Sequence, residues 1–313
     1  MNRSATWLLA FTLLVPAVFA KDKEKKNQEP DDPGKGVNLY SLDRELALGR
    51  GMAVEVERES RLLDDAVVSE YVSRLGQNLV RNSDAKLPFT IKVIDSDEIN
   101  AFALPGGFLF VDTGLVLKAE NEAELAGVLA HEIAHVAARH GTRQASRAEI
   151  VNYASIPLIF MGGVAGYAVR QVAMLAVPMG FLQFSRGFEA QADYLGLQYI
   201  DRSGYDPNAF VDFFEKIETL EKRKPGTIAR AFSSHPMTAT RIRNAQKEIQ
   251  QELHAHPQYV LDTSEFHDVK ARLAALQNRR GLEQPWTNMP VLKKRHRNPS
   301  TEDDGQPTLK RNE

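Results

Sequence analysis

The sequence contains no cysteine, and this absence excludes three kinds of chemistry. Disulfide cross-links, thiol nucleophiles and cysteine-ligated zinc all need the missing side chain. Any metal bound here must therefore be held by histidines and carboxylates. Net charge is also nearly lacking, at −2 over 313 residues, so no global charge favours nucleic acid as a partner.

Apolar runs long enough to cross a bilayer, roughly 20 residues, are lacking as well. At the N-terminus, Arg3, a short apolar run and the small-residue exit at Ala20 predict a secretory signal peptide over residues 1–20, cleaved after Ala20. We therefore expect an exported, periplasmic protein. Residues 153–184 are the most apolar later part, but Arg170, prolines and glycines interrupt them. We expect two short buried helices there, or a hairpin that either covers the cleft or makes a peripheral contact with a membrane surface.

Composition divides the rest of the chain. Residues 21–38 are charged and contain prolines, which predicts a flexible lead-in, and residues 281–313 predict a disordered tail. Residues 39–280 have helical apolar spacing, interrupted after Pro88 by strand-like alternation. These patterns predict one domain of the α+β class that is mainly helical and contains a small sheet.

One stretch, residues 121–141, has the sequence NEAELAGVLAHEIAHVAARHG. Asn121 followed by Glu124 predicts a capping-box start for a helix, and Gly141 predicts its end. The stretch contains the pattern H-E-x-x-H, which arises by chance in roughly one chain of this length in a hundred. Its position in the middle of an amphipathic helix favours a functional site.

His131 and His135 are four residues apart, so their imidazoles leave one helix face a turn apart. Two ligands of one tetrahedral zinc can share this spacing. Glu132 lies beside them, where its carboxylate can take a proton from a zinc-bound water whose pKa the metal has lowered from about 15.7 to roughly 7. The pattern thus predicts a zinc ion with a general base.

The segment FSRGFEAQAD supplies a candidate third ligand on a second predicted helix. Glu189 and Asp193 are four apart and share one face. We assign Glu189 as the third zinc ligand and Asp193 as the partner that accepts a ring N–H from a ligand histidine. His140 is the competing third ligand, but the metzincin spacing would need a histidine at the position of Gly141.

The strand-like segment before the H-E-x-x-H helix suggests a way to bind substrate. Along Asn100, Ala101, Phe102 and Ala103, small and large side chains alternate. A strand with small residues on its outer face lets an extended peptide pair with it. The alternative is an ordinary edge strand packed on the helix.

Four motifs in order, NAFALPGG, HEIAHVAARH, SRGFEAQAD and SSHPMTATRI, resemble metallopeptidase family 48, which includes HtpX, the CAAX prenyl proteases and the periplasmic BepA-like proteases. The chain is most similar in type to the periplasmic, soluble members, although it lacks the tetratricopeptide repeats of the BepA-like ones. The resemblance covers residues 41–250. It implies a zincin fold of the gluzincin type, one zinc held by His131, His135 and Glu189, and Glu132 as the general base.

Residues and resemblance together predict a zinc-dependent endopeptidase of the cell envelope that acts in protein quality control. Its expected substrates are unfolded or misassembled envelope proteins. The alternative is a non-proteolytic chaperone or assembly factor that uses the same cleft. A structural zinc protein fits less well, because three protein ligands leave one metal position open.

His235 and Arg241 are the candidates for stabilising the oxyanion of the reaction. A second hypothesis makes His235 the fourth zinc ligand of a resting enzyme, which moves away when substrate or a partner binds. The third alternative is a polar surface histidine.

Overall fold

The structure is a computed structural model that describes residues 33–159, 184–223, 235, 238–253 and 256–283. The predicted signal peptide, most of the lead-in, the centre of the apolar segment 153–184 and nearly all of the tail lie outside these residues. Among the described helices, none is both long and apolar enough to cross a membrane.

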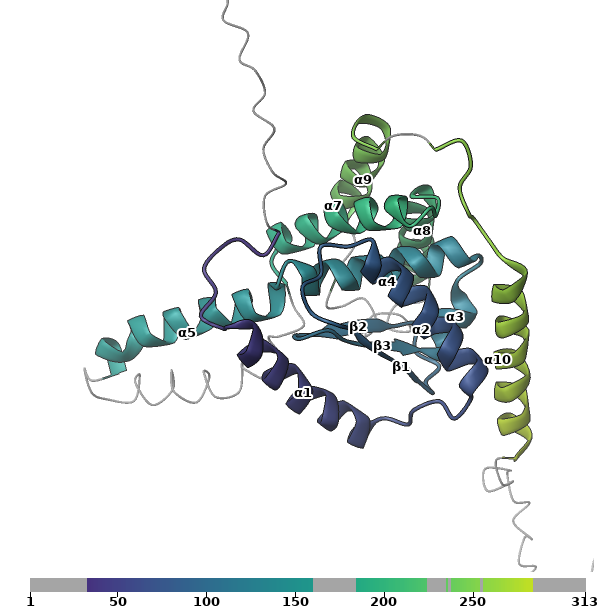
Figure 1. The fold of residues 1–313 in the computed structure, drawn as a ribbon, viewed down its shortest axis with the longest axis horizontal. Helices are drawn as coiled ribbons and strands as arrows, with labels where there is room; N and C mark the ends of the chain where they lie inside the picture. The colour runs from purple at the N-terminus through teal and green to yellow at the C-terminus, as the bar shows by residue number, and fades with distance from the viewer. Residues whose placement is uncertain (1–32, 160–183, 224–234, 236–237, 254–255, 284–313) are drawn as a thin grey trace, which may run out of the picture.

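Helices form most of the described chain, and they surround one small sheet (Figure 1). The elements in order are α1 (Leu42–Glu59), α2 (Ala66–Arg81), β1 (Thr90–Ile94), β2 (Ala101–Leu104), β3 (Phe108–Asp112), α3 (Thr113–Lys118), α4 (Glu122–Ala137), α5 (His140–Ile159), α7 (Arg186–Arg202), α8 (Asn208–Arg223), α9 (Ala239–Gln251) and α10 (Ser264–Glu283). The expected mainly helical α+β class is confirmed.

The sheet has the order β1-β3-β2. Strand β3 pairs parallel with β1 and antiparallel with β2, which leaves β2 at one edge. The turn between β2 and β3 contains Gly106 (φ 80) and Gly107 (φ 90), a left-handed conformation that favours glycine. The predicted strand, Pro-Gly-Gly turn and strand are therefore present, and the hairpin places β2 beside α4.

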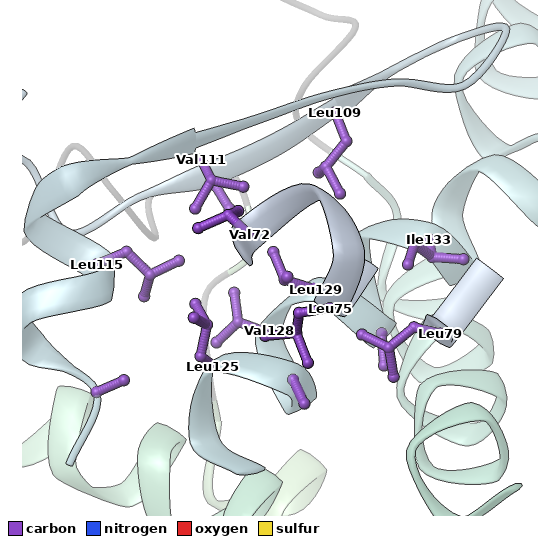
Figure 2. Close-up of a cluster of buried hydrophobic side chains, with 14 of the residues drawn as sticks. Val72, Leu75, Leu79, Leu109, Val111, Leu115, Leu125, Val128, Leu129 and Ile133 are labelled. Atoms are coloured by element: carbon purple, nitrogen blue, oxygen red, sulfur yellow. The ribbon is translucent and has the colours of Figure 1, made fainter. Parts of the chain in front are cut away.

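Helix α4 is the centre of the molecule. All of its residues, Glu122–Ala137, are buried, because the sheet and α2 cover one side while α7 and α8 cover the other. Figure 2 shows the contact between α2, the sheet and α4. The labelled side chains are Val72, Leu75 and Leu79 of α2, Leu109 and Val111 of β3, Leu115 of α3, and Leu125, Val128, Leu129 and Ile133 of α4. A helix held on both sides positions its polar side chains firmly.

The two ends of α4 differ in how well the sequence predicted them. Asn121 caps the start, since its side chain accepts from the N–H of Glu124 at 2.9 Å. The reciprocal half of the capping box is wrong, because the Glu124 carboxylate instead accepts from the N–H of Glu120 at 2.8 Å. The predicted end at Gly141 is also wrong: α4 ends at Ala137.

Arg139 explains the early end of α4. Its φ of 56° is left-handed, a conformation that costs a residue with a Cβ about 1 kcal/mol or more. The Arg139 side chain donates to the Glu45 carboxylate at 2.6 Å and to the Tyr40 carbonyl at 2.7 Å. Because these partners lie near the start of α1, the turn after α4 depends on long-range contacts and α5 starts at His140.

Two glycines of α1 predict opposite effects on stability. A Cβ at Gly49 would come within 1.7 Å of the Pro105 carbonyl oxygen, whereas a Cβ at Gly51 would meet nothing within 4 Å. We expect Gly49→Ala to lower the free energy of unfolding by about 1–3 kcal/mol. Gly51→Ala should raise it by roughly 0.5–1 kcal/mol, because alanine loses less entropy in a helix. Urea unfolding followed by circular dichroism measures both, and equal stability of the two variants would contradict the packing of α1 on the β2–β3 turn.

Candidate metal centre

The two histidines of α4 present nitrogen atoms to the same point. Nε2 of His131 and Nε2 of His135 are 3.1 Å apart, and both side chains are buried. Two nitrogens bound tetrahedrally to one zinc at 2.0–2.1 Å lie about 3.3 Å apart. The separation of the two rings therefore fits a shared metal.

Helix α7 brings a carboxylate to this pair. Oε2 of Glu189 lies 3.5 Å from His131 Nε2, and Oε1 lies 3.6 Å from His135 Nε2. His235 Nδ1 approaches Glu189 Oε1 at 2.7 Å. One ligand atom from each of these four residues lies within 4.8 Å of the others, and this set of imidazole and carboxylate groups suits zinc.

The charges around the cluster favour a cation. Burial lowers the pKa of His131, but the carboxylates of Asp193 and Glu189 outweigh it and raise the pKa to about 9. Burial raises the pKa of Glu189, yet contacts with His131 and His235 hold it below its usual range. The ionised carboxylate of Glu189 thus faces the point where the nitrogens converge, with Asp193 behind His131, and a divalent ion would neutralise this negative charge.

Glu132 lies between the cluster and the sheet. Its Oε2 accepts from the N–H of Ala103 on β2 at 3.2 Å, and its Oε1 lies 3.8 Å from His235 Nε2. Burial raises the pKa of Glu132. A more basic carboxylate at this place suits proton transfer.

Asp193 and Arg241 lie behind the cluster. Oδ1 of Asp193 is 3.2 Å from His131 Nδ1, on the far side of the ring from Nε2. Arg241 donates to both oxygens of Asp193, at 2.7 and 2.6 Å, and its Nη1 lies 2.8 Å from Glu189 Oε2. The same nitrogen lies 3.3 Å from the His235 carbonyl oxygen. Arg241 therefore joins both carboxylates to the backbone of His235.

The predicted substrate strand lies beside Glu132, but one part of that prediction is wrong. The side chains of Ala101 and Ala103 do not form an outer face, because they are buried in the main core. Phe102 points to the other face, where it stacks on Phe110 at 5.3 Å. Asn100 continues the pairing by accepting from the N–H of Asp112 at 2.9 Å. The part of β2 that remains for a substrate is its main chain at the sheet edge, where the N–H of Ala103 is directed at Glu132.

His140 is not part of the four-residue cluster. Its Nδ1 contacts Nδ1 of His135 at 3.1 Å, which is the nitrogen remote from the cluster. Nε2 of His140 lies 3.1 Å from Oε1 of Gln191 on α7. From the sequence, His140 was predicted only as a competing metal ligand, and Gln191 was not predicted as a site residue. Gln191 is two residues from Glu189, a spacing that does not place two side chains on the same face of a helix.

Known proteins are similar to this chain over most of its length. The model of peptidase family M48 matches residues 67–249. The Beta-barrel assembly-enhancing protease of Escherichia coli (strain K12) is 30% identical over 292 residues, which cover 88% of this chain and 57% of that protein. Mitochondrial metalloendopeptidase OMA1 of Schizosaccharomyces pombe is 32% identical over 215 residues, covering 67% of this chain and 62% of that protein. The chain thus spans little more than half the length of these relatives.

The matched range 67–249 takes in more than half of the chain, and it includes every residue of the cluster and both residues behind it. The order of the four sequence motifs led to the same group. This chain belongs to peptidase family M48.

Proposed function

We propose that the chain is a zinc-dependent endopeptidase that acts on proteins of the cell envelope. The observation that carries the proposal is the convergence of His131, His135 and Glu189 on one point, with the carboxylate of Glu132 beside it. Three protein ligands and a neighbouring base are the composition of a hydrolytic zinc site rather than a structural one. Zinc, when bound, supplies a Lewis acid that acidifies water and polarises a carbonyl.

The residues of the chain supply the remaining chemistry. Glu132 accepts the proton of the attacking water and passes it to the leaving amine. The N–H of Ala103 holds one oxygen of Glu132, so the carboxylate keeps one orientation. Oδ1 of Asp193 lies 3.2 Å from Nδ1 of His131, and its proposed role is to accept the proton of that nitrogen, which would leave the Nε2 lone pair for the metal. Arg241 pairs with both Asp193 and Glu189 and holds them in place, a role that uses the N–H groups which an oxyanion donor would need.

Main-chain pairing with β2 is the proposed way in which substrate binds. The edge of β2 runs past Glu132, and a hollow lined by Ala103, Pro105, His135 and Phe184 lies beside its end. An extended peptide on this edge would reach the cluster without requiring a particular side chain. Unfolded or misassembled proteins of the envelope offer such extended segments. The name of the Escherichia coli relative supports an envelope substrate, and we propose that residues 1–20 direct export to the periplasm.

A metal-removal experiment tests the proposed activity. We expect the purified protein to hydrolyse casein, a chelator to abolish the hydrolysis, and one equivalent of zinc to restore it. The non-proteolytic chaperone alternative predicts suppression of aggregation with casein left intact. Intact casein after incubation with the zinc-loaded protein would therefore reject the endopeptidase proposal.

His235 is proposed as a fourth ligand that occupies the open metal position in the resting enzyme. Its Nδ1 lies in the cluster, 2.7 Å from Glu189, and its side chain is buried, which argues against a surface histidine. Removing a blocking ligand frees that position, so His235→Ala should hydrolyse an unstructured substrate faster than the wild-type protein. A loss of about 10²-fold or more in turnover would instead assign His235 to oxyanion stabilisation. Unchanged turnover would contradict both roles.

A further inference from the structure

The N–H partner of the second metal-site histidine is itself a histidine. His140 is fully buried, and its ring is stacked on Phe188 at 4.4 Å. It is the first residue of α5 and directly follows the left-handed Arg139. The Nδ1–Nδ1 distance of 3.1 Å means that one ring donates and the other accepts. Which ring carries the proton decides whether His135 can bind a metal through Nε2.

Gln191 determines the direction of the hydrogen bond between the two histidines, because two other residues fix the orientation of its side-chain amide. Arg143 can only donate, and its Nη1 lies 3.3 Å from Oε1 of Gln191. The Pro33 carbonyl can only accept, and it lies 3.1 Å from Nε2 of Gln191. The reversed amide would place N–H against guanidinium and oxygen against oxygen. Oε1 of Gln191 therefore faces His140.

The protons follow from that orientation. Oε1 of Gln191 accepts, so Nε2 of His140 carries a proton and donates to it at 3.1 Å. A neutral His140 then has its lone pair on Nδ1, and His135 must donate to it from Nδ1. The Nε2 of His135 is left with a lone pair, which points toward His131 Nε2 and Glu189.

We propose that His140 and Gln191 are positioning residues that hold His135 in the tautomer with the proton on Nδ1, so that Nε2 binds zinc. The inference rests on the proposed zinc site. It gives the two ligand histidines different partners: a carboxylate, Asp193, for His131, and an uncharged imidazole–amide relay for His135. The relay sets the tautomer without adding a negative charge to a site that already holds three carboxylates.

Nuclear magnetic resonance of protein labelled with ¹⁵N in histidine tests the tautomers directly. In the zinc-loaded protein, two-bond ¹H–¹⁵N correlations should show His140 neutral with its proton on Nε2, and His135 with its proton on Nδ1. A proton on Nδ1 of His140, or on both of its nitrogens, would overturn the proposal. Zinc stoichiometry is measured on the same sample, so a failure to bind zinc counts against the proposed function and not against the relay.

Zinc affinity measured against a chromophoric chelator tests the role of the relay. Gln191→Met and His140→Phe should weaken zinc binding roughly 10- to 100-fold, as expected for loss of a partner behind a ligand. Gln191→Glu keeps an acceptor for His140 and should therefore bind zinc more tightly than Gln191→Met. The matched control is Gln198→Met, on the same helix and also partly buried but bonded to Glu248. Wild-type zinc affinity in Gln191→Met would overturn the proposal, and this result stands even if His140→Phe does not fold.

Discussion

Replacing Glu132 with glutamine should lower the rate of peptide hydrolysis by about 10²- to 10⁴-fold while the zinc remains bound. Glutamine has nearly the same shape, and its amide oxygen can still accept from the Ala103 N–H that holds Glu132. What it cannot do is accept the proton of the attacking water. The loss should therefore appear in turnover, and metal content should stay at one zinc per chain.

The measurement combines casein hydrolysis with metal analysis of the same preparation. Glu120→Gln is a suitable control, because that carboxylate precedes α4 and its side chain is 70% exposed. It should leave both quantities unchanged. Substantial hydrolysis by Glu132→Gln would show that another group is the general base. His235, whose Nε2 lies 3.8 Å from Oε1 of Glu132, would then be the candidate.

Removing a ligand should have a different signature, in which metal and activity are lost together. His135→Ala and Glu189→Ala each delete one side chain of the four-residue cluster, and the loss in zinc affinity should exceed the roughly 100-fold limit for a supporting partner. Hydrolysis should fall to background. Zinc should raise the melting temperature of the wild-type protein but not that of the variants, since only a bound ligand stabilises the folded state.

Histidine replacement needs a control away from the site. His267→Ala serves, because the His267 side chain is 61% exposed and pairs with Asp262. Full zinc content in Glu189→Ala would show that Glu189 is not the third ligand. The cluster would then have to bind metal through the two α4 histidines and His235.

The sequence predicted the pairs of site residues that lie on one helix at a spacing of four. His131 and His135 on α4, and Glu189 and Asp193 on α7, were found because a spacing of four places side chains on one face whatever the rest of the fold does. The start of α4 followed from the local hydrogen bond of Asn121. Family and fold class were predicted for the same reason: the motifs and periodicities are local.

Features that depend on distant partners were not predictable. The predicted end of α4 was too far along the chain. The helix ends earlier because Arg139 adopts a left-handed conformation that is held by Glu45, a residue distant in the sequence. The sequence around Arg241 did not indicate that its guanidinium group pairs with two carboxylates of α7. The small alanines of β2 were read as an open face, although α4 covers them. In each case the deciding partner lies on another element.

The proposed metal ligands come from three parts of the chain, namely α4, α7 and the position of His235. Glu189 and His235 are separated by 46 residues, and both lie far along the chain from α4. Closing such loops costs entropy, which the packing of α7 on α4 and of α9 on α7 offsets. The four-residue cluster therefore cannot form in an unfolded chain, and we expect the proposed activity to be absent until α7 and His235 have packed against α4.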